Sequence, residues 1–196
     1  AFQKVTEYDT QISNYLNQSK NPDTMPERIN LNLQISKSLR YGENPHQNAS
    51  IYSINNHQKD SLKLLLGKEI SYNNYVDSYT ALKCIKDFNE PTCVIIKHAN
   101  PCGISIKENK LESYKSAISC DPISAFGGIV SCNYKINENL AKELKKIFLE
   151  VIIANGFEKK ALRILKTKKN LRLIDATNFT LNENFKFISA NNAMLY

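Results

Sequence analysis

The chain has 196 residues, of which 42% are hydrophobic and 23% are charged, and its formal net charge at pH 7 is +7. These values are typical of a globular protein with one sizeable core, or with one domain and an extension. No apolar run approaches the roughly 20 residues that a membrane span requires, and no signal-peptide pattern is present. We therefore expect a cytoplasmic protein with no membrane partner. Because it begins at Ala1 without a methionine, we expect it to be a piece of a longer protein.

The first part of the chain predicts a helix, a linker and two strands. Apolar residues at helical spacing over 2–16 predict an amphipathic helix. The polar stretch 17–27 contains two prolines and is typical of a linker. From 29 to 35, apolar and polar residues alternate strictly, which predicts a half-buried strand. A loop with Gly and Pro at 39–47 and a short strand at 51–53 follow.

From residue 62 onward, short apolar runs alternate with helical patterns. The apolar runs that predict strands are 64–66, 92–96, 128–131, 151–153 and 171–174. The expected helices are 74–88, 111–119, 140–148 and 159–165. This β–α order predicts an α/β fold with a mostly parallel sheet and helices on both faces. The tail after Thr177 has no clear period and is expected to be irregular.

Lys97 and His98 are the most informative residues for function. They follow the buried strand 92–96, and we expect Pro101 and Gly103 to turn the chain away after them. In open α/β sheets, ligands bind outside the carboxyl ends of the strands. A cation beside a titratable imidazole suits proton transfer combined with stabilisation of a developing negative charge. Without further context, such a pair is more often ordinary surface chemistry.

Cysteine and lysine usage excludes several kinds of protein. The cysteines are at positions 84, 93, 102, 120 and 132. They form no CxxC pair, so neither a disulfide framework nor a zinc ribbon is indicated, and a reducing compartment is the simplest setting. Much of the basic excess falls on the predicted helices or the turns after them, at lysines 142, 145, 146, 159, 160, 166, 168 and 169. Such lysines usually form solvated faces, so we expect no nucleic-acid partner, whereas anionic small molecules remain compatible.

Six segments together resemble one family. They are 39–47 (LRYGENPHQ), 67–74 (GKEISYNN), 94–103 (VIIKHANPCG), 121–128 (DPISAFGG), 150–154 (EVIIA) and 165–172 (LKTKKNLR). In this order and spacing they resemble the bifunctional purine-biosynthesis family AICAR transformylase/IMP cyclohydrolase, at the N-terminal part of its transformylase region. The resemblance implies an α/β, cytidine-deaminase-like layered fold. It also implies that residues 1–28 are a helix and linker leaving a cyclohydrolase domain absent from this piece, and that 29–196 form the first transformylase subdomain.

The resemblance also implies a reaction and residues that perform it. The family transfers a formyl group from 10-formyltetrahydrofolate to the 5-amino group of AICAR, an aminoimidazole carboxamide ribonucleotide. His98 is implied as the proton acceptor and Lys97 as the transition-state stabiliser. The implied AICAR-binding residues are Arg40, Tyr41, His98, Gly127 and Glu150. A guanidinium suits a phosphate, and a glycine lets the backbone approach a ligand closely.

Several of these residues have a simpler structural explanation. Gly127 also suits a tight turn before a strand, and Glu150 could be an exposed carboxylate that closes a helix. Lys169 could approach the phosphate, but it is more simply a solvated lysine. His46 is expected to organise its loop through hydrogen bonds, and His57 is given no role.

The resemblance implies AICAR and a folate co-substrate as partners, a homodimer in the full-length enzyme, and no metal. A zinc deaminase is one rival, because the related fold carries that chemistry. It needs His-x-Glu and a separate Pro-Cys-x-x-Cys, whereas here His98 is followed by Asn100 and position 105 is Ser. The other rival is an inactive fragment that binds nucleotide or mediates assembly.

Overall fold

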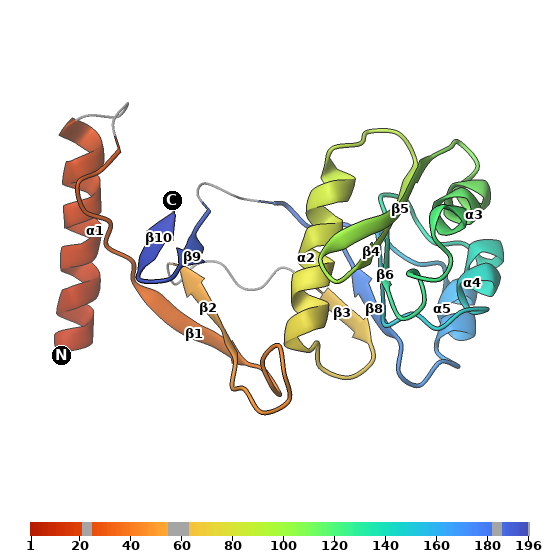
Figure 1. Ribbon diagram of the computed structural model, residues 1–196, viewed down its shortest axis with the longest axis horizontal. Helices are drawn as coiled ribbons and strands as arrows, with labels where there is room; N and C mark the ends of the chain where they lie inside the picture. The colour runs from red at the N-terminus through yellow and green to blue at the C-terminus, as the bar shows by residue number, and fades with distance from the viewer. Residues whose placement is uncertain (21–24, 55–62, 182–185, 196) are drawn as a thin grey trace.

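The computed structural model is shown in Figure 1. It describes residues 1–20, 25–54, 63–181 and 186–195. His57 and the centre of the expected linker at 17–27 lie outside these ranges. We call 63–181 the sheet region, and the elements before and after it the outer region.

A six-stranded sheet organises the sheet region, in the order β3-β8-β7-β6-β4-β5. The strands are β3 (Lys63–Leu66), β4 (Thr92–Lys97), β5 (Asn100–Ile106), β6 (Ile129–Cys132), β7 (Val151–Ala154) and β8 (Arg172–Asp175). Strands β6, β7 and β8 are parallel, whereas the pairs β3–β8, β4–β5 and β4–β6 are antiparallel. The sheet is therefore mixed, and the expectation of a mostly parallel sheet is wrong. The main cause is β5, an unpredicted strand that returns directly alongside β4 as a hairpin.

Helices cover both faces of this sheet, as predicted (Figure 1). They are α2 (Tyr72–Lys86), α3 (Lys110–Cys120), α4 (Glu138–Leu144) and α5 (Lys159–Leu165). Helix α2 lies on one face, and the other three lie on the opposite face. Ser71, Asn109 and Asn137 cap α2, α3 and α4 by accepting backbone N–H groups of the first turn. Helix α4 ends earlier than its apolar pattern suggested, at Leu144 instead of residue 148.

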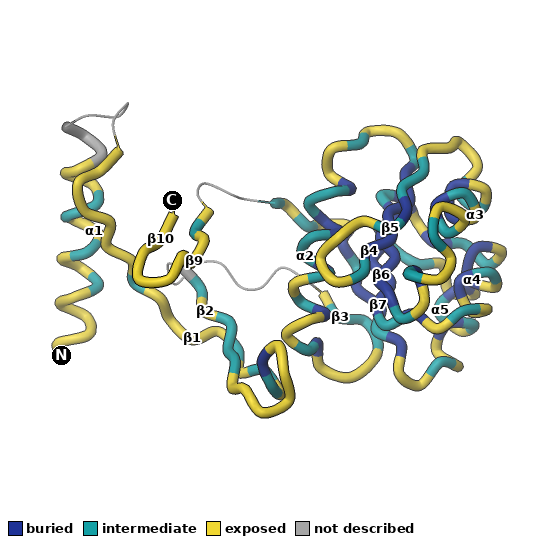
Figure 2. Tube along the Cα trace, viewed as in Figure 1, coloured by how far each residue is buried: buried dark blue, intermediate teal, exposed yellow. Residues whose placement is uncertain are grey.

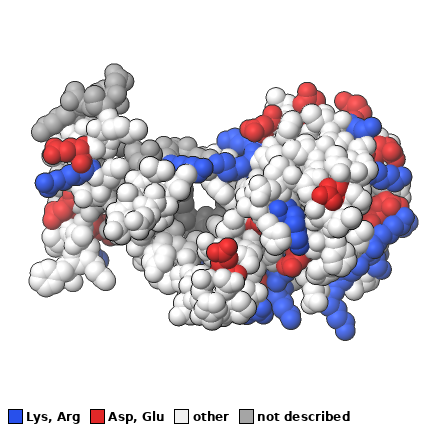
Figure 3. Space-filling model, viewed as in Figure 1, with Lys and Arg blue, Asp and Glu red and all other residues white. Residues whose placement is uncertain are grey.

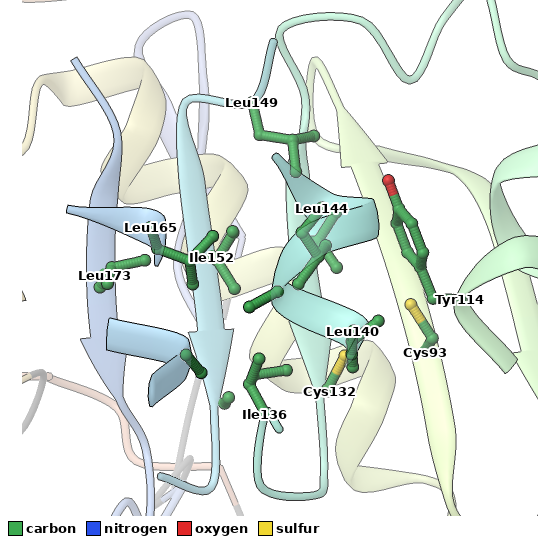
Figure 4. Close-up of a cluster of buried hydrophobic side chains, with 14 of the residues drawn as sticks. Cys93, Tyr114, Cys132, Ile136, Leu140, Leu144, Leu149, Ile152, Leu165 and Leu173 are labelled. Carbon is green, nitrogen blue, oxygen red and sulfur yellow. The ribbon is translucent and has the colours of Figure 1, made fainter. Parts of the chain in front are cut away.

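The core has two layers because alternate strand residues point to opposite faces. In β4, Cys93 and Ile95 pack with the α3–α5 layer, whereas Val94 and Ile96 pack with the α2 layer. Figure 4 shows the larger layer, in which Leu140 and Leu144 of α4 lie among side chains of the sheet. Burial on both faces explains why these strands are continuous apolar runs in the sequence.

The contact between α3 and β5 depends on one glycine. A Cβ atom at Gly103 would lie 2.0 Å from the carbonyl oxygen of Ala117 in α3, so only glycine fits there. The register with β4 shifts at this point, because Ile95 pairs with Gly103 whereas Ile96 pairs with Pro101. Cys102 is the additional residue of this β-bulge, a feature that often redirects a strand near a functional site.

The outer region contains a helix and two hairpins. The helix is α1 (Phe2–Lys20), and the hairpin strands are β1 (Leu33–Ser38), β2 (Ser50–Ile54), β9 (Ile188–Ala190) and β10 (Ala193–Leu195). The prediction of the first helix is confirmed, but the tail predicted to be irregular contains β9 and β10. Strand β1 starts later than residue 29 and is not half-buried, since the exposed fractions of Leu33 and Ile35 are 48% and 53%. Within the described residues, no helix is both long and apolar enough to cross a membrane.

The basic excess is distributed with acidic residues over the sheet region (Figure 3). Of the eight lysines singled out in the sequence, seven are exposed, and Lys168 is half-buried. Lys142 pairs with Glu138, and Lys146 pairs with Glu143, each with a nitrogen–oxygen distance of 2.7 Å. The prediction that these lysines form solvated helix faces is therefore confirmed.

Candidate active site

Strand β4 ends at the end of the sheet where the three parallel strands β6, β7 and β8 begin. We call this end of the strands, across the sheet, the sheet edge. Ile96, near the end of β4, pairs with Ile129, the first residue of β6. Ile129 pairs with Val151 at the start of β7, and Val151 pairs with Arg172 at the start of β8. The expected site at the carboxyl ends of parallel strands is therefore corrected: β4 and β3, which run antiparallel to the three parallel strands, bring their carboxyl ends here, whereas β6, β7 and β8 bring their amino ends.

The predicted site residues of the sheet region share this edge. Lys97 is the last residue of β4, Gly127 lies two positions before β6, and Glu150 immediately precedes β7. Lys169 is exposed in the turn before β8. Residues that are 30 to 72 positions apart from Lys97 in the sequence are thus gathered by the pairing of neighbouring strands.

His98 and Ala99 form the tight turn that joins β4 to β5. Lys97 and Asn100 are paired on either side of it, and the φ angles of His98 and Ala99 are 52° and 57°. A two-residue turn with positive φ at both positions favours Asn-Gly, and the left-handed conformation costs an ordinary L-residue roughly 1–2 kcal/mol. His98 is exposed at the tip. Pro101 and Gly103 lie within β5, so the prediction that they form the turn is wrong.

The Lys97 side chain contacts the segment before β6. It is half-buried, and its Nζ donates a hydrogen bond to the carbonyl oxygen of Gly127 at 3.0 Å. By strand alternation Lys97 shares the face of Cys93 and Ile95, which α3–α5 cover. The ammonium group is thus held beside the backbone of Gly127 and next to the turn that carries His98.

Gly127 occupies a position that a side chain would disturb. Its φ is +69°, and a Cβ atom there would lie 3.0 Å from Lys97 Nζ and 3.4 Å from Phe148 Cε1. Its N–H donates to the carbonyl oxygen of Phe148 at 2.8 Å. The structural explanation for this glycine, a tight turn before a strand, is confirmed. The same lack of a Cβ keeps the backbone open to close approach.

The turn before Gly127 is organised by Asp121. Its Oδ1 accepts the N–H of Ser124 at 2.9 Å, and its carbonyl oxygen accepts the N–H of Ala125 at 3.1 Å. Hydrogen bonds from Ser124 lower the pKa of the Asp121 carboxyl group, because they stabilise its ionised form. The side chain and the carbonyl group of Asp121 thus both contribute to the turn that precedes Gly127.

Glu150 does not close a helix, because α4 ends six residues earlier, at Leu144. Its Oε2 accepts a hydrogen bond from Asn74 Nδ2 of α2 at 2.8 Å and lies 3.7 Å from Nη1 of Arg172. The Arg172 side chain is 14% exposed and that of Glu150 is 38% exposed. Asn74 is buried. This carboxylate is therefore held by one hydrogen bond, from Asn74, and by an ion pair with Arg172, whereas part of it remains accessible.

Arg40 and Tyr41 lie in the loop between β1 and β2. Arg40 Nη2 is 3.3 Å from the Tyr41 hydroxyl oxygen, and its guanidinium carbon is 4.8 Å from the centre of the Tyr41 ring. Asn73 Nδ2, at the start of α2, donates to the carbonyl oxygen of Glu43 at 3.1 Å and ties this loop to the sheet region. Among the described residues, no hydrogen bond or ion pair joins Arg40 or Tyr41 to the residues at the sheet edge.

The same loop contains His46, which is exposed. The hydrogen bonds that close the loop involve Gln47: its Oε1 accepts the N–H of Asn44 at 2.9 Å, and its carbonyl oxygen accepts the N–H of Gly42 at 2.7 Å. Gln47 therefore has the organising role that was predicted for His46.

Metal-binding side chains do not gather in the part of the chain that the structure describes. No group of three or more His, Cys, Asp or Glu residues there is arranged to hold a metal ion. Cys102, the thiol nearest to His98 in the sequence, lies in the β-bulge, and its Sγ is 3.6 Å from the carbonyl oxygen of Ile95. Desolvation raises the pKa of this thiol, which disfavours the thiolate that a metal would need.

Three polar residues of the site were not predicted from the sequence: Asn74, Asp77 and Arg172. Asn74 and Asp77 are three residues apart at the start of α2 and contact Glu150 and the backbone of Ala99, respectively. Spacing of i,i+3 places two side chains on one helix face, so this pair could have been recognised as a polar face. Arg172 lies in the predicted strand 171–174 and shows no comparable signal.

The fold and the site together define an α/β protein in which a lysine, a histidine and a carboxylate occupy one edge of a mixed sheet. A family model described as the AICARFT/IMPCHase bienzyme matches residues 1–196. The chain therefore belongs to this family of bifunctional purine-biosynthesis proteins.

Curated relatives agree with this assignment. The chain is 45% identical over 178 residues to the "Bifunctional purine biosynthesis protein PurH" of Caldicellulosiruptor saccharolyticus, covering 88% of this chain and 35% of the relative. The protein of the same name from Petrotoga mobilis is 42% identical over 198 aligned positions, which cover 100% of this chain and 39% of the relative. The protein of the same name from Prochlorococcus marinus is 45% identical over 187 residues, which cover 90% of this chain and 36% of the relative. The chain thus spans between 35% and 39% of the length of these relatives.

Proposed function

We propose that this chain contributes the proton acceptor and part of the nucleotide site to formyl transfer from 10-formyltetrahydrofolate to the 5-amino group of AICAR. The observation that carries the proposal is the common location of Lys97, His98, Gly127 and Glu150 at one sheet edge. Membership of the bifunctional purine-biosynthesis family supports the pathway, and the location of these groups favours the transformylase activity.

The reaction requires the two kinds of group that the hairpin turn presents. The lone pair of the AICAR amine is delocalised into the ring, so the amine is a weak nucleophile. Its attack on the formyl carbon forms a carbon–nitrogen bond, an oxyanion and a positively charged nitrogen. His98 accepts the proton from that nitrogen, and the Lys97 ammonium stabilises the oxyanion. When the oxyanion collapses, the bond to N10 of the folate breaks, and N10 receives a proton.

The surroundings of Lys97 are compatible with this role. Its Nζ donates to the carbonyl oxygen of Gly127 at 3.0 Å, which leaves two of its three donor hydrogens for other acceptors. His98 is exposed, so its imidazole is accessible to a substrate and to water. The Glu150 carboxylate, which precedes β7 and accepts a hydrogen bond from Asn74, is an acceptor for hydroxyl or amide groups of the nucleotide.

We assign the phosphate of AICAR to Arg40 and the neighbouring contact to Tyr41. The guanidinium forms a planar fork that matches phosphate oxygens. It now lies over the Tyr41 ring, and the loop that carries both is tied to α2 through Glu43 and Asn73. Nucleotide binding therefore requires the loop to present Arg40 toward the sheet edge.

The proposal also covers the wider protein. Residues 1–28 lead from a cyclohydrolase domain into the transformylase region, and 29–196 form its first subdomain, with a cytidine-deaminase-like fold. Much of the folate site lies beyond the residues of this chain. The complete enzyme is a homodimer, and its transformylase reaction uses no metal.

The test is formyl transfer by a polypeptide that completes this chain to the length of its relatives. Replacing the acceptor in His98→Gln is expected to lower kcat by about 10²- to 10⁴-fold, the usual contribution of general acid–base catalysis. Lys97→Met is expected to lower kcat comparably. The matched control is Lys135→Met, because Lys135 is exposed and follows the carboxyl end of β6, at the opposite edge of the sheet.

Two results would contradict the assignment. A wild-type kcat in His98→Gln would remove this residue from the chemistry. A completed wild-type polypeptide that binds AICAR but transfers no formyl group would favour the alternative of a nucleotide-binding or assembly module.

A further inference from the structure

We propose that Asp77 is a positioning residue for the Lys97–His98 pair: its carboxylate holds the turn at His98 and Ala99 in the conformation that presents the imidazole. Asp77 is half-buried in the second turn of α2. Its Oδ1 accepts the backbone N–H of Ala99 at 2.7 Å, although the two residues are 22 positions apart. This inference rests on the proposed function, because it assigns a role toward the residues of that reaction.

The geometry of the turn leaves one N–H group available to a partner from outside the hairpin. The flanking residues, Lys97 and Asn100, make the ladder contacts of the hairpin, so the N–H of Ala99 has no acceptor within the hairpin itself. Asp77 supplies that acceptor, and a bond to an ionised carboxylate is shorter and stronger than a neutral one. Asn100 Nδ2 supports the turn from the other side by donating to the carbonyl oxygen of His98 at 2.8 Å.

The residues of the turn do not favour its conformation by themselves. Histidine is tolerated at positive φ more often than most residues, but alanine is disfavoured there. His98 and Ala99 have φ values of 52° and 57° in place of the usual Asn-Gly. Such a conformation persists only when its surroundings determine it, and the contact with Asp77 is a direct way to do so.

Helix α2 is a rigid base for this contact. Its residues Ala81, Leu82 and Ile85 are buried against the sheet. Asn74, one turn before Asp77, donates to Glu150 at 2.8 Å. One face of α2 therefore contacts both the proposed catalytic turn and the Glu150 carboxylate.

The experiment compares variants of the completed polypeptide in the formyl-transfer assay, with kcat counted per AICAR-binding site. Asp77→Ala removes the acceptor, and Asp77→Leu removes it while keeping four side-chain heavy atoms branched at Cγ. Because displacing a catalytic group by about 1 Å can cost about 100-fold, we expect both to lower kcat between about 10- and 100-fold. The KM for AICAR should stay within about threefold of the wild-type value, which corresponds to a free-energy change of less than about 1.4 kcal/mol. Asp77→Asn keeps a carbonyl acceptor and is expected to retain at least a third of the wild-type kcat.

The control is Asp87→Ala, at the opposite end of the same helix, which should leave kcat unchanged. Counting per binding site removes the effect of any unfolded fraction. Wild-type kcat in Asp77→Leu, or equal losses in Asp77→Asn and Asp77→Leu, would overturn the positioning role. If the wild-type protein transfers no formyl group, the proposed function itself fails, which is a separate result.

Discussion

The sheet region and the outer region use similar apolar strand residues but bury them very differently (Figure 2). Val94 and Ile152 in the sheet are 0% exposed, whereas Leu33 and Ile35 of β1 are 48% and 53% exposed. The difference arises because helices cover both faces of the six-stranded sheet, while β1 pairs with β2 alone in the described part of the chain. Apolar alternation thus specifies an extended backbone, and a second layer is required before it produces a core.

The two regions also hold their site residues differently. At the sheet edge, Lys97 and Glu150 each have a hydrogen-bond partner from another element. In the outer region, Arg40 contacts its neighbour Tyr41, and its loop is tied to α2 through an exposed hydrogen bond from Asn73. We infer that the sheet edge is a preformed part of the site and that the loop adjusts when a nucleotide binds.

The largest expected difference between the regions is in the stability of core variants. Ile152→Ala should lower the free energy of unfolding by about 2–5 kcal/mol, because it opens a cavity in a core that cannot collapse to fill it. The matched variant Ile35→Ala should change it by less than about 0.5 kcal/mol, because the side chain is more than half exposed. Urea unfolding followed by circular dichroism measures both. Equal losses of unfolding free energy in the two variants would show that β1 is buried in the complete protein.

A smaller difference is expected between two adjacent asparagines of α2. Asn74→Ala removes the buried donor to Glu150 and should weaken AICAR binding about tenfold, which is about 1.4 kcal/mol. Asn73→Ala removes only the exposed bond to the loop and should weaken binding by about threefold or less. Calorimetric titration of both variants with AICAR measures the contrast. A larger loss of AICAR affinity in Asn73→Ala than in Asn74→Ala would mean that the loop, and not the sheet edge, dominates binding.

The smallest expected effect is a pH dependence at Asp121. Its pKa is lowered in the folded protein by the hydrogen bonds from Ser124, so ionisation of this carboxyl group favours folding. This contribution is fully present above the unfolded pKa, about 3.9, and is lost as the pH falls through the lower folded value. The difference in unfolding midpoint between wild type and Asp121→Ala should therefore shrink as the pH falls below about 4. A difference that is constant with pH would contradict the role of the charged form.

Sequence patterns predicted most elements of the sheet region because their residues repeat on two buried faces. They did not predict β5, since Pro101 and Gly103 are usual turn residues, and the reasons they are tolerated lie in the bulge and in the close approach of Ala117. They also could not give the direction of β4 relative to its neighbours, which decides which strand ends meet at the site.

The candidate site could be proposed from the residues themselves where one segment carries both the motif and its position, as with Lys97 and His98. Family resemblance supplied Arg40, Tyr41, Gly127 and Glu150. Asn74, Asp77 and Arg172 escaped prediction because each acts through a contact with a segment distant in sequence. Such contacts depend on the packing of α2 against the sheet and on strand order, and neither is encoded locally.

The most direct test of the proposed site is a crystal structure of the completed polypeptide with AICAR bound. We expect the nucleotide to lie across the starts of β6 and β7, in contact with the Gly127 backbone and the Glu150 carboxylate. Its 5-amino nitrogen should lie within about 3.2 Å of the His98 imidazole or one water away from it. A nucleotide bound away from this sheet edge, or with its amine on the side opposite to His98, would contradict the account.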